Sequence, residues 1–317
     1  MRRGDRIPAG AAKSDATDAP LKIPDMTTTD SSPEGVQAHL AQLFVYPVKS
    51  CAGVELREAL LTESGLDLDR TWMVVDDRGR FLSQREQPRM ALIQPKIRAH
   101  DVVLRAPGML ALHLGINEVE TATRVQVWDD EVPAWDMGPT AAQWFSDFLG
   151  QPGLRLVRFD PDVRRLSSAR WTGGLEAPVE FADGFALLVT STASLAGLNA
   201  RLQAAGHAPV GMERFRPNLV IGGVQEHDED RLDVLHIAST GGPVRMRPVK
   251  PCARCPIPDV DPASAALGTA VRDALQGYRQ DPRLGGAITF GMNAIVLEGA
   301  GQTLRVGDAV RARYRFD

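Results

Sequence analysis

The chain lacks several features that define whole classes of protein. Its 317 residues include only three cysteines, which are too few for a disulfide scaffold and predict a reducing compartment, here the cytoplasm. No apolar run reaches the roughly 18 residues that cross a bilayer, so we expect no membrane association. The net charge is -4, which argues against a general nucleic-acid binder. Lysine is also scarce, and the chain has only five: Lys13, Lys22, Lys49, Lys96 and Lys250.

Glycine and proline are abundant instead, with 29 and 22 residues. This composition favours many turns and short strands over long helices. Residues 1–38 are rich in small and polar side chains and contain hardly a large apolar one before Leu40, so we predict a disordered tail. Because the remaining length suits about two domains, we expect an N-terminal domain at residues 39–170 and a C-terminal domain at residues 171–317.

Short strand-like apolar runs dominate both predicted domains. We place strands at residues 43–46, 54–61, 72–75, 91–97, 102–104, 111–114, 125–127, 157–159, 185–189, 219–221, 234–237, 244–249, 294–297 and 310–314. Helical spacing predicts helices at about 139–149, 192–202 and 269–276. Thr140 with Gln143 resembles a capping box, and Gly150 is a stop signal. The pattern therefore predicts a mainly β fold with some α, built around a small barrel rather than a parallel α/β sheet.

Two of the three cysteines stand two residues apart, at Cys252 and Cys255, after the predicted strand 244–249. Zinc would need two more ligands, and the sequence offers no second pair at metal-binding spacing. A thioredoxin-like dithiol would need a helix at the second cysteine, whereas Pro256 follows it directly. A plain pair of half-buried thiols remains open. So does a single thiolate on a transition metal whose other ligands come from a cofactor.

Two further segments combine cationic and polar side chains. Lys49 and Ser50 follow the first predicted strand, in a turn that ends in Gly53, and such a turn can cradle a phosphate. Arg216 and Asn218 precede the predicted strand 219–221 and offer a guanidinium and an amide to one ligand. A surface turn and a salt-bridged loop are the simpler interpretations of these two segments.

Some candidates were divided between a structural and a functional role. Arg85 and Arg89 either line a cleft or anchor the hairpin predicted at residues 76–79, and we favour the structural role. Trp128 and Trp135 could shape a substrate pocket, although large aromatic side chains are more often found in the core. The six histidines show no ligand spacing, so we assign them no chemistry.

Taken together, these segments resemble the MOSC-domain family of molybdenum-cofactor proteins, which includes the mitochondrial amidoxime reducing components and their bacterial homologues. The resemblance spans Leu40 to Asp317. The segments that carry it are Tyr46-Pro47-Val48-Lys49-Ser50-Cys51, Asp69-Arg70-Thr71-Trp72, Arg85-Glu86-Gln87-Pro88-Arg89, Phe181-Ala182-Asp183-Gly184, Phe215-Arg216-Pro217-Asn218, Cys252-Ala253-Arg254-Cys255, Phe290-Gly291-Met292-Asn293 and Val306-Gly307-Asp308.

The resemblance implies a fold and a set of site residues. It implies an N-terminal MOSC-associated β-rich domain with one or two helices, a C-terminal MOSC β-barrel, and a molybdopterin held without covalent bonds between them. Cys255 would be the ligand of the molybdenum and the catalytic residue, and Cys252 would not coordinate it. We expected Arg254 or Lys250 to help deprotonate that thiol. The residues implied to bind the cofactor are Lys49, Ser50, Arg70, Asp183, Arg216, Asn218 and Asn293, the last at a position where some relatives carry an aromatic side chain.

The implied activity is the reduction of small N-hydroxylated compounds, N–OH to N–H, with loss of water. Some bacterial relatives carry a ferredoxin domain, whose cluster needs four cysteines, so with three we expect no iron–sulfur cluster in this chain. Electrons would come from a separate donor, an iron–sulfur or haem protein with a flavin reductase. The alternative is a protein that binds the cofactor or carries sulfur for it without reducing anything. Sulfur-donating relatives attach a pyridoxal-phosphate desulfurase domain, for which residues 1–38 leave no room.

Overall fold

The computed structural model describes residues 35–316, all of which fall within a single compact unit. The described chain is mostly strand with four α-helices, which confirms the predicted mainly β class with some α. Most of the predicted tail lies outside the described residues. Its end does not, because strand β1 (Val36–Val45) begins before Leu40, and residues 36–38 therefore belong to a strand. No helix within the described range is long and apolar enough to cross a bilayer.

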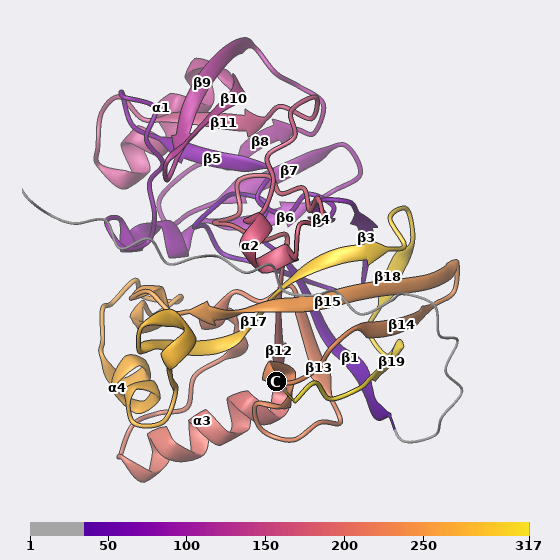
Figure 1. Ribbon diagram of the computed structural model, residues 1–317. Helices are drawn as coiled ribbons and strands as arrows, with labels where there is room; N and C mark the ends of the chain where they lie inside the picture. Colours follow the sequence, from indigo (N-terminus) through magenta and orange to yellow (C-terminus); the bar gives the residue numbers. More distant parts are fainter. Residues whose placement is uncertain (1–34, 317) are drawn as a thin grey trace, which may run out of the picture. The chain divides into compact units, whose positions relative to one another are not determined.

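Seven strands close into a barrel (Figure 1). In order around the barrel they are β12 (Leu187–Ser191), β13 (Leu219–Gly222), β1, β19 (Ala309–Ala312), β14 (Leu235–Ser239), β15 (Gly242–Ala253) and β17 (Ala287–Glu298). The pairing of β12 with β17 closes the ring. Only β12 and β13 run parallel within it. Two short strands extend this sheet, β2 (Val54–Leu56) on β1 and β16 (Gln280–Asp281) on β17.

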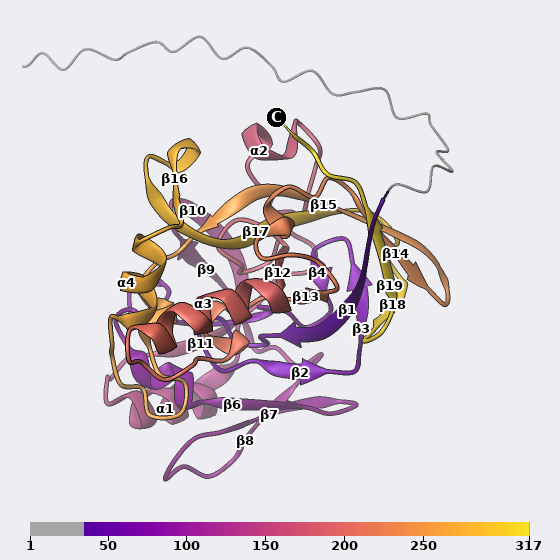
Figure 2. The same cartoon turned by 90° about the horizontal axis from the view of Figure 1, so that it is seen from below.

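Strand β1 precedes the boundary that the sequence suggested near residue 170, yet it pairs with strands that follow that boundary. It pairs with β13 through Leu43 opposite Leu219, and with β19 through Val36 opposite Ala312. Figure 2 shows β1, in indigo, running beside β19, in yellow. We expected residues 171–317 to form the barrel. The structure adds β1 to the strands of that segment. Pairing across the boundary also occurs outside the barrel, because β18 (Thr303–Arg305) pairs with β3 (Glu58–Thr62) from the N-terminal segment.

Three smaller sheets complete the fold. β3 also pairs with β4 (Gly65–Leu66). A four-stranded antiparallel sheet has the order β5 (Trp72–Val75), β11 (Arg155–Phe159), β10 (Asp130–Asp136) and β9 (Thr121–Val127). A three-stranded sheet contains β6 (Gln94–Ile97), β7 (Asp101–Arg105) and β8 (Leu112–Gly115). The α-helices are α1 (Gly138–Leu149), α2 (Ala169–Thr172), α3 (Thr192–Ala204) and α4 (Ala270–Gln276). The 3₁₀ helices are η1 (Pro88–Leu92), η2 (Met212–Phe215), η3 (Asp228–Asp230), η4 (Ile257–Asp259) and η5 (Pro282–Leu284).

Helix α1 packs its apolar stripe against β5 and β11. Phe145 and Phe148 are buried there with Trp72. The helix ends at Gly150, which has the left-handed φ of 68° expected of a stop residue. It begins at Gly138, one residue before the predicted start, but the predicted capping box is wrong, because the Gln143 amide donates to Asp147 inside the helix at 2.6 Å rather than back to a cap.

Two other predicted boundaries also shift. The predicted strand 54–61 divides at Arg57, because β2 pairs with β1 while β3 turns away to pair with β18. The predicted strand 91–97 begins inside η1, which Pro88 opens. In addition, β15 extends to Ala253, so Cys252 lies in the strand and not in a loop after it.

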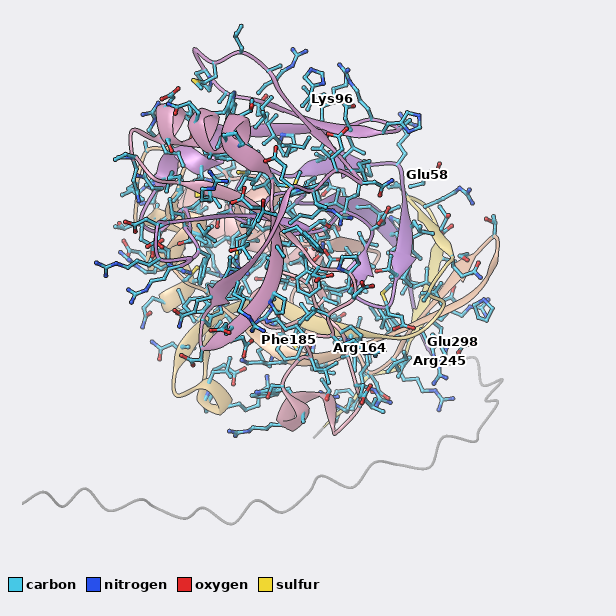
Figure 3. All side chains as sticks on the ribbon, turned by 90° about the horizontal axis from the view of Figure 1, so that it is seen from above. Glu58, Lys96, Arg164, Phe185, Arg245 and Glu298 are labelled. Atoms are coloured by element: carbon cyan, nitrogen blue, oxygen red, sulfur yellow. The ribbon has the colours of Figure 1, made fainter. Side chains whose placement is uncertain are left out.

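Ion pairs link neighbouring strands on the outer surface. Arg245 on β15 lies 3.6 Å from Glu298 on β17, and Arg305 on β18 lies 3.0 Å from Glu58 on β3. Arg245, Glu298 and Glu58 are labelled in Figure 3. Exposed pairs of this kind contribute about 0–1 kcal/mol each. The buried apolar clusters therefore supply most of the stability, as in other domains of this size.

One carboxyl group is buried where α3 meets η3. The Ser194 hydroxyl donates to one Glu229 oxygen at 2.6 Å, and the other oxygen has no hydrogen-bond partner among the described residues. The side chain is fully buried. Burial raises the pKa of Glu229 to about 7, because an apolar surrounding disfavours the charged form.

We expect this group to make stability depend on pH. A carboxyl whose pKa is higher in the folded than in the unfolded state stabilises the fold at low pH, and this contribution is lost as the pH rises through about 7. Between pH 5 and pH 8 the free energy of unfolding of wild type should therefore fall by roughly 2–4 kcal/mol relative to Glu229→Gln. Urea titrations at both pH values measure this. The exposed Glu131→Gln serves as control, and parallel pH profiles for wild type and Glu229→Gln would contradict the assignment.

Candidate functional site

A single cavity collects all the site residues that the sequence suggested. Its wall contains Lys49, Ser50, Arg70, Asp183, Arg216, Asn218, Cys255 and Asn293. Phe185, labelled in Figure 3, is also part of the wall. The enclosed volume is ≈ 130 Å³, whereas ligand pockets typically measure about 300–1,000 Å³. A large ligand would therefore extend from the cavity toward solvent.

The backbone is bent at three of these positions. Ser50, Arg70 and Arg216 have positive φ values of 67°, 56° and 57°. Only seven non-glycine residues in the described range share this conformation, so three of the seven fall in one cavity wall. A left-handed conformation costs roughly 1–2 kcal/mol for such a residue, and strain of this kind concentrates at functional sites. Part of the folding energy is therefore used to hold these residues in place.

Two arginines share one aromatic ring. The guanidinium carbons of Arg70 and Arg216 lie 4.4 and 4.2 Å from the ring centroid of the fully buried Tyr46. Burial and the neighbouring Arg70 lower the pKa of Arg216 to about 10, so Arg216 stays protonated at neutral pH. Two like charges held together in a buried place repel each other. An anion bound between them would relieve that repulsion.

A network of polar groups fixes Arg70 in this position. Asp69 accepts from its guanidinium, and so do the Asn218 side-chain oxygen and the Arg216 carbonyl oxygen, both at 3.1 Å. Asn218 itself is buried, and its amide donates to the Phe44 carbonyl oxygen at 3.3 Å. Asn218 therefore orients Arg70 and joins β1 to the segment before β13. Arg216 in turn donates to the Cys51 carbonyl oxygen at 2.5 Å.

Lys49 is buried and paired. Its ammonium group donates to Asp183 at 2.5 Å and to the Phe181 carbonyl oxygen at 2.7 Å. Burial lowers the pKa of Lys49, and Asp183 acts in the opposite direction. Burial also opposes ionisation of Asp183, but the nearby Lys49 outweighs it and holds the pKa of that carboxyl below its usual range. Arg165 fixes the segment by donating to the carbonyl oxygens of residues 180, 182 and 183.

The cysteine pair lies at the end of β15. Cys252 and Cys255 are free thiols, both half-buried and both in the cavity wall. Arg254 donates to the Cys252 sulfur at 3.0 Å and to the Phe215 carbonyl oxygen at 2.9 Å. Lys250 lies over the rings of Trp171 and Phe185. The direct contacts of Arg254 and Lys250 are with other groups, so the expectation that one of them helps deprotonate Cys255 stays a prediction.

Sequence reasoning missed several residues of the same cavity. Phe81, Ser83 and Arg85 line it, although the sequence favoured a structural role for Arg85. Arg89 packs outside the cavity, with its guanidinium 4.6 Å from the ring of Phe148 on α1 rather than on the hairpin at residues 76–79. Trp128 is not part of the cavity wall but contacts one of its residues, because its indole N–H donates to Asp183 at 3.1 Å. The signal available in the sequence was the segment 85–89, whose two arginines could not be told apart without the fold.

The described residues contain no group of three or more His, Cys, Asp or Glu side chains that could hold a metal ion. Asn293 donates to the Lys250 carbonyl oxygen at 3.3 Å and so joins β17 to β15 at the cavity wall. A metal in this cavity would therefore need ligands beyond the side chains of the described wall. Cationic side chains line the same wall as the two cysteines.

Comparison with known proteins gives matches along the chain. A family model described as the MOSC N-terminal beta barrel domain matches residues 37–152, and a model of the MOSC domain matches residues 176–311. Human mitochondrial amidoxime-reducing component 1 is 35% identical over 86% of this chain and 82% of its own length. Human mitochondrial amidoxime reducing component 2 is 32% identical over 76% of this chain and 72% of its own length.

A third relative differs in size. Human molybdenum cofactor sulfurase is 28% identical over 80% of this chain but only 29% of its own length. The two family models and the 35% identity to a relative covered over most of its length agree with one another. The chain therefore belongs to the MOSC family.

Proposed function

We propose that this chain binds a molybdenum cofactor in the cavity and reduces small N-hydroxylated compounds. The names of the relatives support this proposal, since two are amidoxime reducing components and one is a molybdenum cofactor sulfurase. The structural observation that carries it is the convergence of two half-buried thiols, a buried lysine and several half-buried arginines on one wall. The electrons would come from a separate iron–sulfur or haem protein with a flavin reductase, and the protein would act in the cytoplasm.

The cationic part of the wall fits a phosphate group. Arg70 and Arg216 lie close together over Tyr46, and their mutual repulsion would be relieved by an anion. The Tyr46 hydroxyl and the Arg254 Nε atom have no hydrogen-bond partner within the described residues, so polar groups beside the cavity remain to be satisfied. Arg70, Arg216, Lys49 and Ser50 would therefore hold the phosphate end of the cofactor.

The thiol part of the wall fits a soft metal. Molybdopterin brings two sulfur ligands of its own, so one protein thiolate is enough for the donor set. Cys255 would be that ligand, because Cys252 is already engaged by Arg254. Asp183 and Asn218 would act less directly, since Asp183 neutralises Lys49 and Asn218 orients Arg70. Asn293 would support the floor of the cavity from β17.

The reaction converts R₂N–OH, two electrons and two protons into R₂N–H and water. When bound, the cofactor supplies two-electron redox chemistry at its metal. The protein binds and orients both partners. Its cations are held in place before the ligand arrives, so little reorganisation is needed on binding. The half-exposed position of the wall leaves the substrate access from solvent.

Replacement of Cys255 tests the ligand assignment. After expression with an intact cofactor supply, the Cys255→Ala variant should lose more than about 100-fold in the rate of amidoxime reduction with reduced dye as electron source, because the metal loses its only protein ligand. Elemental analysis should show molybdenum in the wild type. The matched control is Cys252→Ala, which should keep much of the activity.

Three outcomes would argue against this reading. A wild-type protein without molybdenum contradicts cofactor binding. Equal loss of activity in Cys252→Ala and Cys255→Ala contradicts the assignment of the ligand. Molybdenum in the wild type without any reduction of N-hydroxylated compounds by dye-reduced protein would favour a cofactor-binding or sulfur-carrying protein.

Arg216→Gln tests the cationic cradle independently of turnover. Loss of one charge-assisted contact to a phosphate costs about 1.5–3 kcal/mol. The affinity of the variant for the pterin should therefore fall about tenfold to 100-fold. Bound pterin, released and quantified by fluorescence, should fall per mole of chain. Arg89→Gln changes an arginine outside the cavity and should leave the pterin content as in wild type. Equal pterin content in all three proteins would exclude Arg216 from the cradle.

A further inference from the structure

Trp128 occupies an unfavourable backbone position at the edge of the cavity. It is the first of the two residues that join β9 to β10, since Val127 and Asp130 pair across the hairpin. Of the two turn residues only Trp128 has a positive φ, at 56°. A two-residue hairpin with this pattern prefers glycine at its first position. A large aromatic residue is therefore retained where local conformation disfavours it, and 46% of it stays exposed.

The indole ring is nevertheless held in one orientation. Its N–H donates to Asp183 at 3.1 Å, the same carboxylate that accepts from Lys49. Phe81 packs edge-on against it, with ring centroids 5.1 Å apart at 68°. Two separate segments of the chain thus fix Trp128 beside the cavity, and a fixed ring loses little entropy when a flat ligand stacks on it.

Arg85 joins these two rings. Its guanidinium carbon lies 4.9 Å from the Trp128 ring centroid and 5.9 Å from that of Phe81. Its ion pair with Glu86 is long, at 3.7 Å, and that carboxylate is 61% exposed. Glu86 also accepts hydrogen bonds from the backbone and hydroxyl of Ser83. Phe81, Arg85 and Trp128 are called the rim cluster below.

The other cations of the cavity have closer partners. Lys49 donates to Asp183 and Arg216 to the Cys51 carbonyl oxygen, both at 2.5 Å, and Arg70 donates to Asp69. Arg254 is engaged by Cys252 and Phe215. Within the described part of the chain, the Arg85 guanidinium thus makes no hydrogen bond, and its acidic neighbour Glu86 is distant and largely exposed. Arg85 is therefore the cavity arginine most easily turned to an incoming anion.

We propose that the rim cluster selects the substrate, and that its preferred class is planar aromatic N-hydroxylated compounds with an anionic substituent. This proposal rests on the function proposed above for the cavity. The flat ring stacks on the exposed indole face, which is favourable for aromatic pairs. Arg85 binds the carboxylate or phosphate of the substrate, and its planar guanidinium suits either oxyanion. The N–OH group then lies toward the cavity, on the side of Cys255.

Binding measured without turnover provides the first test. The probes are 4-carboxybenzamidoxime and its neutral isostere 4-carbamoylbenzamidoxime, titrated into the full-length protein by calorimetry with no reductant present. One charge-assisted interaction should make the carboxylate bind about tenfold to 100-fold more tightly in wild type. Arg85→Gln should abolish that difference. Arg124→Gln, which changes an exposed arginine on the same hairpin paired with Glu131, should preserve it.

Substitutions of Trp128 separate recognition from structural support. Trp128→Gly should weaken binding of both probes about tenfold, while its melting temperature stays equal to or above that of wild type because glycine relieves the strained turn. Trp128→Phe should recover much of the binding. A large drop in melting temperature for Trp128→Gly, with unchanged affinity in the folded protein, would mean that the ring supports the hairpin only and would overturn its role.

Steady-state kinetics with dye-reduced enzyme distinguishes this proposal from the function on which it rests. The expected result is a lower KM for the carboxylated probe in wild type, lost in Arg85→Gln with kcat little changed. If both probes are reduced with one KM in wild type and in Arg85→Gln, the rim proposal fails while the reductase function stands. If the carboxylated probe binds as expected but is never reduced, the reductase function fails and recognition by the rim cluster stands.

Discussion

The close approach of Arg70 and Arg216 over Tyr46 is the constraint on which the rest of the structure depends. Two half-buried guanidinium groups in close approach repel each other, and water screens them only in part. Asp69, Asn218 and backbone carbonyl oxygens offset part of the cost. Both arginines also require left-handed backbone. Such an arrangement persists only where several contacts of the surrounding fold enforce it together, as those of the barrel do here.

Strand β1 is the element that brings the two arginines together. It pairs with β13 in a register that places the Phe44 amide on the Asn218 carbonyl oxygen at 2.9 Å. The turn after β1 carries Lys49 and Ser50, and the segment before β13 carries Arg216. One ladder of backbone hydrogen bonds thus sets the distance between cationic groups that are far apart in sequence. The cavity is not a gap between two independent modules, because its walls share a sheet.

The sequence allowed the fold class and the members of the cavity to be predicted, but not their individual roles. Alternating apolar runs located most strands, and Gly150 located the end of α1, since both signals are local. The position of β1 inside the barrel was not foreseen, because partner strands are chosen by long-range packing. For the same reason Arg85 and Arg89 looked alike, although one lines the cavity and the other packs on Phe148. Asn218 lines the cavity as expected. Its side-chain amide, however, already accepts a hydrogen bond from Arg70 and donates one to the Phe44 carbonyl oxygen.

The pairing of Val36 with Ala312 has a consequence for how the protein is made. β1 leaves the ribosome early, whereas both of its barrel neighbours, β13 and β19, are synthesised far later. Until then β1 can pair with β2 at Leu43–Val45, but the rest of its edges have no partner, and unpaired strand edges promote aggregation. Contacts between residues so distant in sequence also slow folding. The ring of seven strands can therefore close only after β19 has been synthesised.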